Sequence, residues 1–259
     1  MSSKVTIHEP LRPTRRTMVR SAAWSVPVVA VAATAPAYAS SRCADGLYEV
    51  RWADMNNTTK VTSAVRMSTS GSGVIGTSAV TVTVTNSFGG NMIAGSAPDG
   101  ASNMTTSPFN VGATGARGLM MMQRASGNSL SAPRNGHFQT FTLKFNRAVW
   151  GLKYTVTDID SSNGQYQDRI FVSGAPAVTK KADVSGGGTS TDPFVPRVLN
   201  RNQDPQSDDA GNASVDYGTY SGDTYTITYW NDQSGNLSSN GLQGVFISGL
   251  SFSSETCAP

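Results

Sequence analysis

A strict alternation of apolar and polar residues before an Asp-Ile-Asp sequence constrains the fold of this chain more than any other feature. Phe141, Leu143 and Phe145 alternate with threonine and lysine, and the same alternation continues from Trp150 to Val156. A period of two places successive side chains on opposite faces of a β-strand, so each strand has one core face and one solvent face. The stretch therefore predicts a sheet that is buried on one side.

Three consecutive strands are expected here, over residues 137–146, 149–158 and 169–174. Asp158 and Asp160 follow the apolar parity of the middle strand but stand at its end, and Asp168 opens the next strand. A Ser-Ser-Asn-Gly turn joins the two strands. We therefore expect three carboxylates to converge on one rim of the sheet.

The rest of the chain repeats the strand pattern between turns rich in Gly, Asn and Ser, and shows no helical periodicity after the first 39 residues. Further strands are expected at 47–53, 61–67, 74–86, 118–123, 214–220, 224–231 and 244–252. Two connections, 87–117 and 180–212, are too long for simple turns. The predicted fold is all-β, a jelly-roll-like antiparallel β-sandwich with two long loops.

The pattern of residues 1–39 predicts a twin-arginine signal peptide. Arg15-Arg16 precedes an apolar stretch that is interrupted by Pro27 and too short to span a membrane, and Ala37-Tyr38-Ala39 matches a cleavage site. Residues 40–259 are then expected to form a single secreted domain. No sorting signal or apolar C-terminal tail is seen, so the product is expected to be free or attached to the cell envelope without a covalent anchor.

Removal of the signal peptide would change the formal net charge from +3 to −1, because five of the lost residues are basic and one is acidic. This removes the argument for a nucleic-acid partner. The two cysteines, Cys43 and Cys257, lie at the two ends of the mature chain. In an exported protein such a pair predicts a disulfide, worth about 4–5 kcal/mol in the chain-entropy model, with two free thiols as the alternative.

Catalytic arrangements are mostly excluded by the residues that are missing. The mature chain has one histidine, His137, and no Gly-x-Ser-x-Gly sequence, which disfavours a Ser-His-Asp triad. Zinc would need a His or Cys cluster. A glycan hydrolase would have to use Asp158, Asp160 or Asp168, but a turn lined with Ser, Asn and Gln offers no apolar pocket to raise the pKa of an acid. The sequence therefore favours a non-enzymatic protein.

The same rim suits calcium, which takes six to eight oxygen ligands. Asp158, Asp160, Asn163 and Asp168 are the expected ligands, although their spacing matches an EF-hand loop only superficially. The alternative is a hairpin in which these polar side chains cap backbone amides. The sequence leaves both interpretations open, and no cofactor other than calcium is suggested.

Exposed aromatic rings could stack on sugars. Tyr166 lies in the polar turn, and Trp230 has the wrong parity for the core face of its strand. Trp52, Tyr217 and Tyr220 are further candidates. The alternative is that these rings cover edges of the sandwich.

A resemblance adds to this reading. The segments FTLKFNRAVWGLKYTVTDIDSSNGQYQDRIFV and YTITYWNDQSGNLSSNGLQGVFISGLSF resemble a broad group of exported bacterial surface proteins with an Asp-Ile-Asp strand end, and the N-terminus is similar to signal peptides of actinobacterial envelope proteins. The group has no agreed activity. The resemblance implies a β-sandwich at or beyond the cell surface.

We therefore expect a non-enzymatic secreted or cell-surface-associated protein, adhesin-like or an envelope component, which needs no cofactor and which calcium would stabilise if it occupies the rim. Its expected partner is a cell-wall or extracellular glycan or a surface protein. The alternatives are a carbohydrate-binding module using Tyr166 and Trp230, and an aspartate-dependent glycan hydrolase.

Overall fold

The computed structural model describes residues 45–54, 64–68, 70–72, 80–97 and 101–255. The predicted signal peptide and both cysteines lie outside these residues. Within them the fold is an all-β antiparallel sandwich, which confirms the predicted fold class. None of the short 3-10 helices, η2 (Trp52–Asp54), η3 (Arg134–Gly136) and η4 (Ser238–Gly241), is long or apolar enough to cross a membrane, as far as the described residues go.

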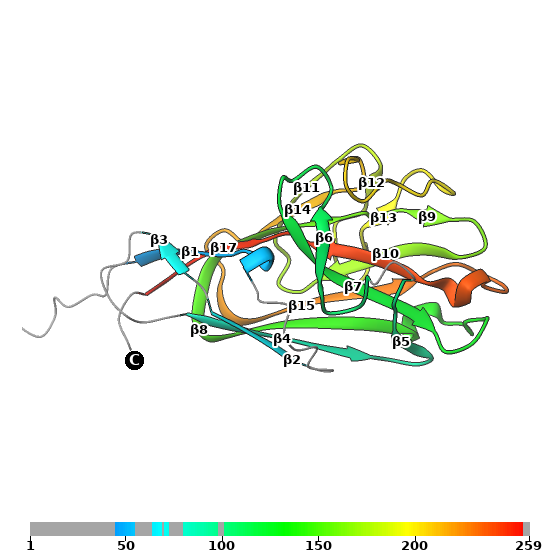
Figure 1. The fold of residues 1–259 in the computed structure, drawn as a ribbon, viewed down its shortest axis with the longest axis horizontal. Helices are drawn as coiled ribbons and strands as arrows, with labels where there is room; N and C mark the ends of the chain where they lie inside the picture. The colour runs from blue at the N-terminus through cyan, green and yellow to red at the C-terminus, as the bar shows by residue number, and fades with distance from the viewer. Residues whose placement is uncertain (1–44, 55–63, 69, 73–79, 98–100, 256–259) are drawn as a thin grey trace, which may run out of the picture. The chain divides into compact units, whose positions relative to one another are not determined.

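The strands follow the chain in order (Figure 1). They are β1 (Asp45–Val50), β2 (Ala64–Ser68), β3 (Ser70–Ser72), β4 (Thr81–Phe88), β5 (Met92–Ala94), β6 (Thr106–Asn110), β7 (Arg117–Ala125), β8 (Phe138–Thr157), β9 (Ser161–Ser162), β10 (Tyr166–Val172), β11 (Ala177–Lys180), β12 (Val184–Ser185), β13 (Val195–Pro196), β14 (Ala213–Asp216), β15 (Ser221–Asn231), β16 (Gln243–Ile247) and β17 (Leu250–Glu255).

Strand β8 belongs to both layers of the sandwich. Its first half pairs with β4 on one side and β15 on the other, whereas its second half pairs with β14, β16 and β17. Figure 1 shows the long strand bending between the two parts. At the bend Trp150 is paired with Ser221 of β15 and with Ser253 of β17, and Gly151 has a φ of +61°, a conformation that favours glycine.

The prediction of two separate strands at 137–146 and 149–158 is therefore wrong, because β8 is continuous over 20 residues. The predicted strand at 244–252 is also wrong in its extent, since it is divided into β16 and β17. The alternation itself is confirmed. Phe141, Leu143 and Phe145 are buried, as are Ile227 and Tyr229 of β15.

Aromatic rings join the two layers in one core. The ring centroids of Phe145, in the first half of β8, and Phe252 of β17 are 4.8 Å apart, and those of Tyr217 and Tyr225 are 4.7 Å apart. Such edge-to-face contacts contribute about 0.5–1.5 kcal/mol beyond the burial of apolar area. The two faces of the sandwich are therefore held together around β8.

Both predicted long loops contain short strands that pair with the sheet or with each other. Strands β5 and β6 pair with β7, and β12 pairs with β13. Phe194, fully buried, exchanges backbone hydrogen bonds of 2.7 and 3.1 Å with Ile170 of β10. This bridge fastens the 180–212 segment to β10 of the large sheet.

The core position of Phe141 gives the first prediction. Phe141→Ala should lower the free energy of unfolding by about 3–5 kcal/mol, because it removes a fully buried ring. Thr142→Ala, one residue along on the solvent face, should change it by less than about 1 kcal/mol. Urea unfolding of the two variants measures the difference. Equal losses would contradict the assignment of the two faces.

Candidate functional site

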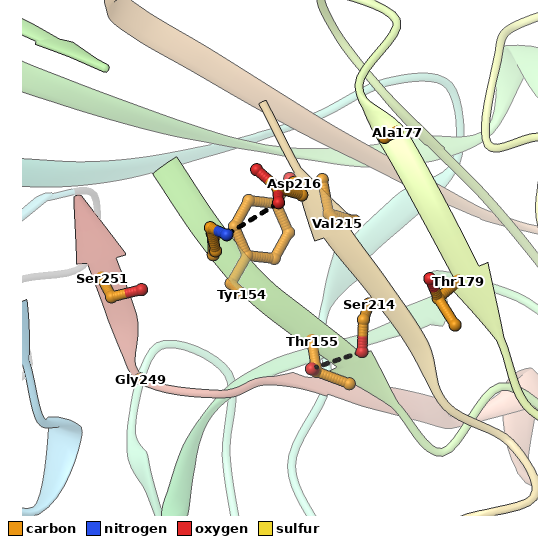
Figure 2. A pocket seen from close by; sticks show the side chains of 10 residues that line it. Tyr154, Thr155, Ala177, Thr179, Ser214, Val215, Asp216, Gly249 and Ser251 are labelled. Carbon is orange, nitrogen blue, oxygen red and sulfur yellow. Dashed lines mark hydrogen bonds and ion pairs between the residues drawn. The ribbon is translucent and has the colours of Figure 1, made fainter. Parts of the chain in front are cut away.

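An open groove lies on the solvent face of the second half of β8. It has a volume of about 440 Å³, and strands β8, β11, β14 and β17 supply its polar lining (Figure 2). The polar side chains that line it are Lys153, Thr155, Thr179, Ser214, Asp216 and Ser251. Alternation explains the lining, because the residues that stand between them, Tyr154 on β8 and Val215 on β14, are buried in the core.

Two contacts order the groove. The Lys153 ammonium forms an ion pair of 2.8 Å with Asp216, and the Thr155 and Ser214 hydroxyls lie 3.0 Å apart (Figure 2). The Lys153 contact and a backbone bond from Gly218 lower the pKa of Asp216 below its usual value. The Asp216 carboxylate therefore stays ionised at neutral pH.

The three predicted rim aspartates come together beyond the end of β8. Asp158 turns the chain out of the strand with a φ of +67°, a conformation that aspartate adopts more readily than most residues. The Ile159 N–H then donates to the carbonyl of Gly211 at 3.0 Å. Strands β9 and β10 form the hairpin that returns Asp168 to Asp160.

Asp168 is fully buried and tied to two segments. Its Oδ2 accepts the N–H of Asp160 at 3.0 Å, and its Oδ1 accepts the hydroxyl of Tyr229 at 2.8 Å. The Asp168 N–H in turn donates to the carbonyl of Asp160 at 3.1 Å. Asp168 therefore caps the turn and links it to β15, as the capping interpretation predicts.

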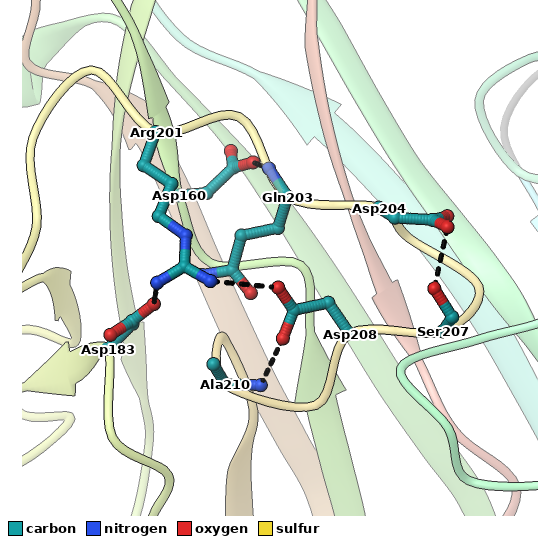
Figure 3. Close-up of polar contacts among 8 residues, drawn as sticks. All are labelled: Asp160, Asp183, Arg201, Gln203, Asp204, Ser207, Asp208 and Ala210. Atoms are coloured by element: carbon teal, nitrogen blue, oxygen red, sulfur yellow. Dashed lines mark hydrogen bonds and ion pairs between the residues drawn. The ribbon is translucent and has the colours of Figure 1, made fainter.

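Asp160 binds the 180–212 segment to the same point. It is 1% exposed, and its Oδ2 accepts the N–H of Gln203 at 2.6 Å (Figure 3). Arg201, two residues earlier, forms ion pairs with Asp183 and Asp208. The rim and the long loop are thus one hydrogen-bonded unit.

Burial has a strong effect on these carboxyls. Loss of hydration raises the pKa of Asp160 to about 6, and it raises the pKa values of Asp158 and Asp168 well above their usual range. The negative charges of the neighbouring carboxyls add to the rise at Asp158 and Asp168. The sequence argument that a polar turn cannot raise the pKa of an acid is therefore wrong here, because the surrounding strands and loop enclose the turn.

The other predicted ligands lie differently. Asn163 is exposed at the tip of the turn, and no hydrogen bond joins it to the three aspartates in the part of the chain that the structure describes. Tyr166 is half-buried, and its hydroxyl lies near the Asp160 carboxyl and donates to Asn202 Oδ1 at 2.7 Å. Asn163 is thus separated from the cluster, whereas Tyr166 belongs to it.

The expectation that Trp230 presents an open ring is wrong. Its side chain is only 7% exposed and packs edge-on against Phe171, with centroids 6.3 Å apart. Trp52 and Tyr217 are buried as well, whereas Tyr220 is 48% exposed. These rings mostly cover or fill the sandwich, as the alternative reading proposed.

Sequence reasoning missed the contribution of Arg201, Gln203 and Asp208. The acidic patch that contains Asp208 is visible in the sequence, but nothing there shows that it meets the rim. Hydrogen bonds that join Asp160 to Gln203, and Ser161 to Asn200 and Arg201, make that connection.

His137 is placed where it cannot serve as the base of a triad. Its Nδ1 accepts the N–H of Asn91 at 3.0 Å, and its Nε2 lies 3.0 Å from Ser131 Oγ. A neutral ring whose Nδ1 accepts must carry its proton on Nε2, so the ring donates to the serine instead of accepting its proton. The pair is structural.

Comparison with known proteins assigns no family to the chain. No protein-family model matches it, and no curated protein is significantly similar to it. Among the residues that the structure describes, no three His, Cys, Asp or Glu side chains are arranged to hold a metal ion.

The raised pKa of Asp160 predicts a pH dependence in metal-free buffer. Between its unfolded value of 3.8 and its folded value of about 6, the folded protein binds more protons at this group, so stability should fall as pH rises. The fall should be on the order of 3 kcal/mol. Urea unfolding at several pH values measures it.

Asp160→Asn is the matched variant, because its amide oxygen can still accept the Gln203 N–H but has no titrating proton. Its stability should fall less over the same pH range. A parallel pH dependence in the wild type and the variant would contradict the assignment.

Proposed function

We propose that the protein is a non-enzymatic secreted or cell-surface-associated β-sandwich, adhesin-like or an envelope component, that binds a cell-wall or extracellular glycan or a surface protein. The observation that carries the proposal is the groove along β8 and β14. It is concave and lined by hydroxyls and by the Lys153–Asp216 pair. Such groups suit the hydroxyls and amides of a polar partner.

The groove does not carry the groups that hydrolysis of a glycosidic bond needs. Paired carboxyls are required, one of them with a raised pKa. Asp216 is the one carboxylate among the residues that line the groove, and its pKa is lowered. A binding role fits this lining better than a catalytic one.

An aspartate-dependent glycan hydrolase has one observation in its favour, the raised pKa of Asp160. However, Asp160 and Asp168 are 1% and 0% exposed, and each has an oxygen engaged by a backbone N–H. A substrate would have to displace these bonds. We therefore rank this alternative below binding.

A carbohydrate-binding module remains the second candidate. With Trp230 buried and Tyr166 half-buried, it would not depend on stacking against these rings. Glycan recognition would instead use hydrogen bonds in the groove, from Lys153, Thr155 and Ser214.

Export by the twin-arginine route and a Cys43–Cys257 disulfide are parts of the same proposal. Both concern residues outside the described part of the chain. They are supported by the sequence patterns alone. A disulfide fits export, because disulfides persist in the oxidising environment outside the cell.

Co-sedimentation with insoluble cell walls and polysaccharides tests the proposal. The wild type should pellet saturably, and Lys153→Ala and Ser214→Trp should weaken binding about tenfold or more, equivalent to about 1.4 kcal/mol. The first variant removes the ion pair, and the second fills the groove.

Lys144→Ala is the matched control. Lys144 also lies on β8, is similarly exposed and pairs with Asp223 at 2.6 Å, but it is outside the groove. The control should bind like the wild type. Equal loss in both lysine variants would show that the groove is not the binding surface.

A further inference from the structure

Trp150 departs from the alternation that the sequence predicts for β8. Val149 and Leu152 are both fully buried although they are three residues apart. The two residues between them therefore do not alternate across the strand. A bulge explains the departure, since the pairing with β17 takes a step of three residues on β8, from Lys153 to Trp150, against a step of two on β17. Gly151, with its φ of +61°, accommodates the extra residue at the bend seen in Figure 1.

The register places Trp150 on the same face as the groove. Residues directly opposite each other on antiparallel strands project to the same side of a sheet. Trp150 is opposite Ser253 of β17, and Lys153 is opposite Ser251. The two serines share the solvent face, because Phe252 between them is buried in the core. Since Lys153 and Ser251 line the groove (Figure 2), Trp150 adjoins it.

Trp150 and Leu47 bring apolar surface to this polar face. Leu47 of β1 is also opposite Ser253, on its other side, and is 57% exposed. Trp150 is partly exposed and does not belong to the buried core of the described residues. Opposite residues have Cβ atoms about 4.5–5.5 Å apart, so the small Ser253 side chain lies between two apolar ones. We call Leu47, Ser253 and Trp150 the Trp150 strip.

The charged side chains beside the strip are paired. Lys153 forms its ion pair with Asp216 at 2.8 Å. Glu49, which is opposite Ser251, pairs with Arg51 at 2.7 Å. Each pair joins one positive and one negative charge, so the pairs exert little net attraction on a charged partner. This face therefore suits a neutral partner.

We propose that the Trp150 strip is a subsite for a sugar ring and that the groove beside it binds a neutral polysaccharide. The inference rests on the binding function proposed for the groove and names its partner. A sugar ring has an apolar C–H face that packs on an aromatic ring, and hydroxyls at its edge that need hydrogen bonds. The strip supplies the aromatic ring, and Lys153, Thr155 and Ser214 supply the hydrogen bonds.

One extended polysaccharide chain can reach both parts of the surface. Ser253 of the strip and Ser251 of the groove are two residues apart on β17, which corresponds to about 7 Å. A chain that lies across the strip with one ring therefore places the next part of its length over the groove. The strip would set the position of the chain, and the groove would bind the hydroxyls that follow.

A protein partner fits this surface less well. Stable protein interfaces bury about 800 Å² on each partner and have an apolar centre that is depleted of charge. Here the Lys153–Asp216 pair and the hydroxyls occupy the groove, and the apolar strip lies to one side of it. A polysaccharide presents hydroxyls along its whole length, which matches this arrangement.

Co-sedimentation of the purified protein with cellulose, with chitin and with protease-treated cell walls tests the inference. The wild type should bind at least one of them. Trp150→Ala should weaken that binding about tenfold or more, because it removes the ring, whereas Trp150→Phe should stay within about threefold of the wild type. Raising NaCl from about 0.05 M to about 0.5 M should change the affinity less than about twofold, because charge does not hold a neutral partner.

Tyr220→Ala is the matched control. Tyr220 is 48% exposed, but its ring packs against the core rings of Tyr217 and Tyr225, and it does not line the groove. This variant should bind like the wild type.

Acrylamide quenching of tryptophan fluorescence tests the strip without Trp150→Ala, in case that variant does not fold. A soluble oligosaccharide of the bound polysaccharide should protect part of the wild-type fluorescence from acrylamide. Trp150→Phe should lack this protected part, because Trp52 and Trp230 are only 0% and 7% exposed. Equal protection in the two proteins would mean that the sugar does not cover Trp150.

The outcomes separate this inference from the function proposed for the groove. If Trp150→Ala binds like the wild type while Lys153→Ala and Ser214→Trp bind less, the groove remains the binding surface and the strip is not a subsite. If the affinity falls tenfold with salt, the partner is charged. Pelleting with untreated but not with protease-treated walls would identify a surface protein as the partner and overturn the inference alone. Absence of pelleting with every material would overturn both.

Discussion

The continuous pairing of β8 in both layers is the constraint on which the rest of the structure depends. A strand of 20 residues cannot remain in one layer of a small sandwich, so it bends at Gly151 and changes partners. Its neighbours are placed by reference to it: β4 and β15 flank its first half, and β14 and β17 flank its second.

The two features discussed as functional follow from this placement. The solvent face of the second half of β8 becomes the floor of the groove, because its core face is occupied by Leu152, Tyr154 and Val156. Where β8 ends, the chain must turn while still enclosed by neighbouring strands and the 180–212 segment. A polar turn is therefore buried, and its carboxyls need partners that an exposed hairpin would find in water.

Much of this fold could be predicted from the sequence, because alternation depends only on residues two apart. It correctly identified the core face at Phe141, Leu143 and Phe145. Alternation carries no signal for whether Asn146 and Arg147 form a hairpin or continue the strand, so the continuity of β8 was missed. The same alternation predicts that Trp230 points away from the core face of its strand. Its burial, however, depends on contact with Phe171 from another strand, which no local pattern reveals.

The aspartate cluster also depends on a contact between distant segments that local patterns do not reveal. Asp158, Asp160 and Asp168 are close in sequence, and their convergence was predictable from a hairpin. Gln203 reaches them from more than thirty residues away through one backbone hydrogen bond to Asp160, so the sequence offered Asn163 as the nearer amide. Burial then reverses the chemistry expected of a polar turn: enclosed carboxyls without a compensating charge must hold a proton, water or a cation.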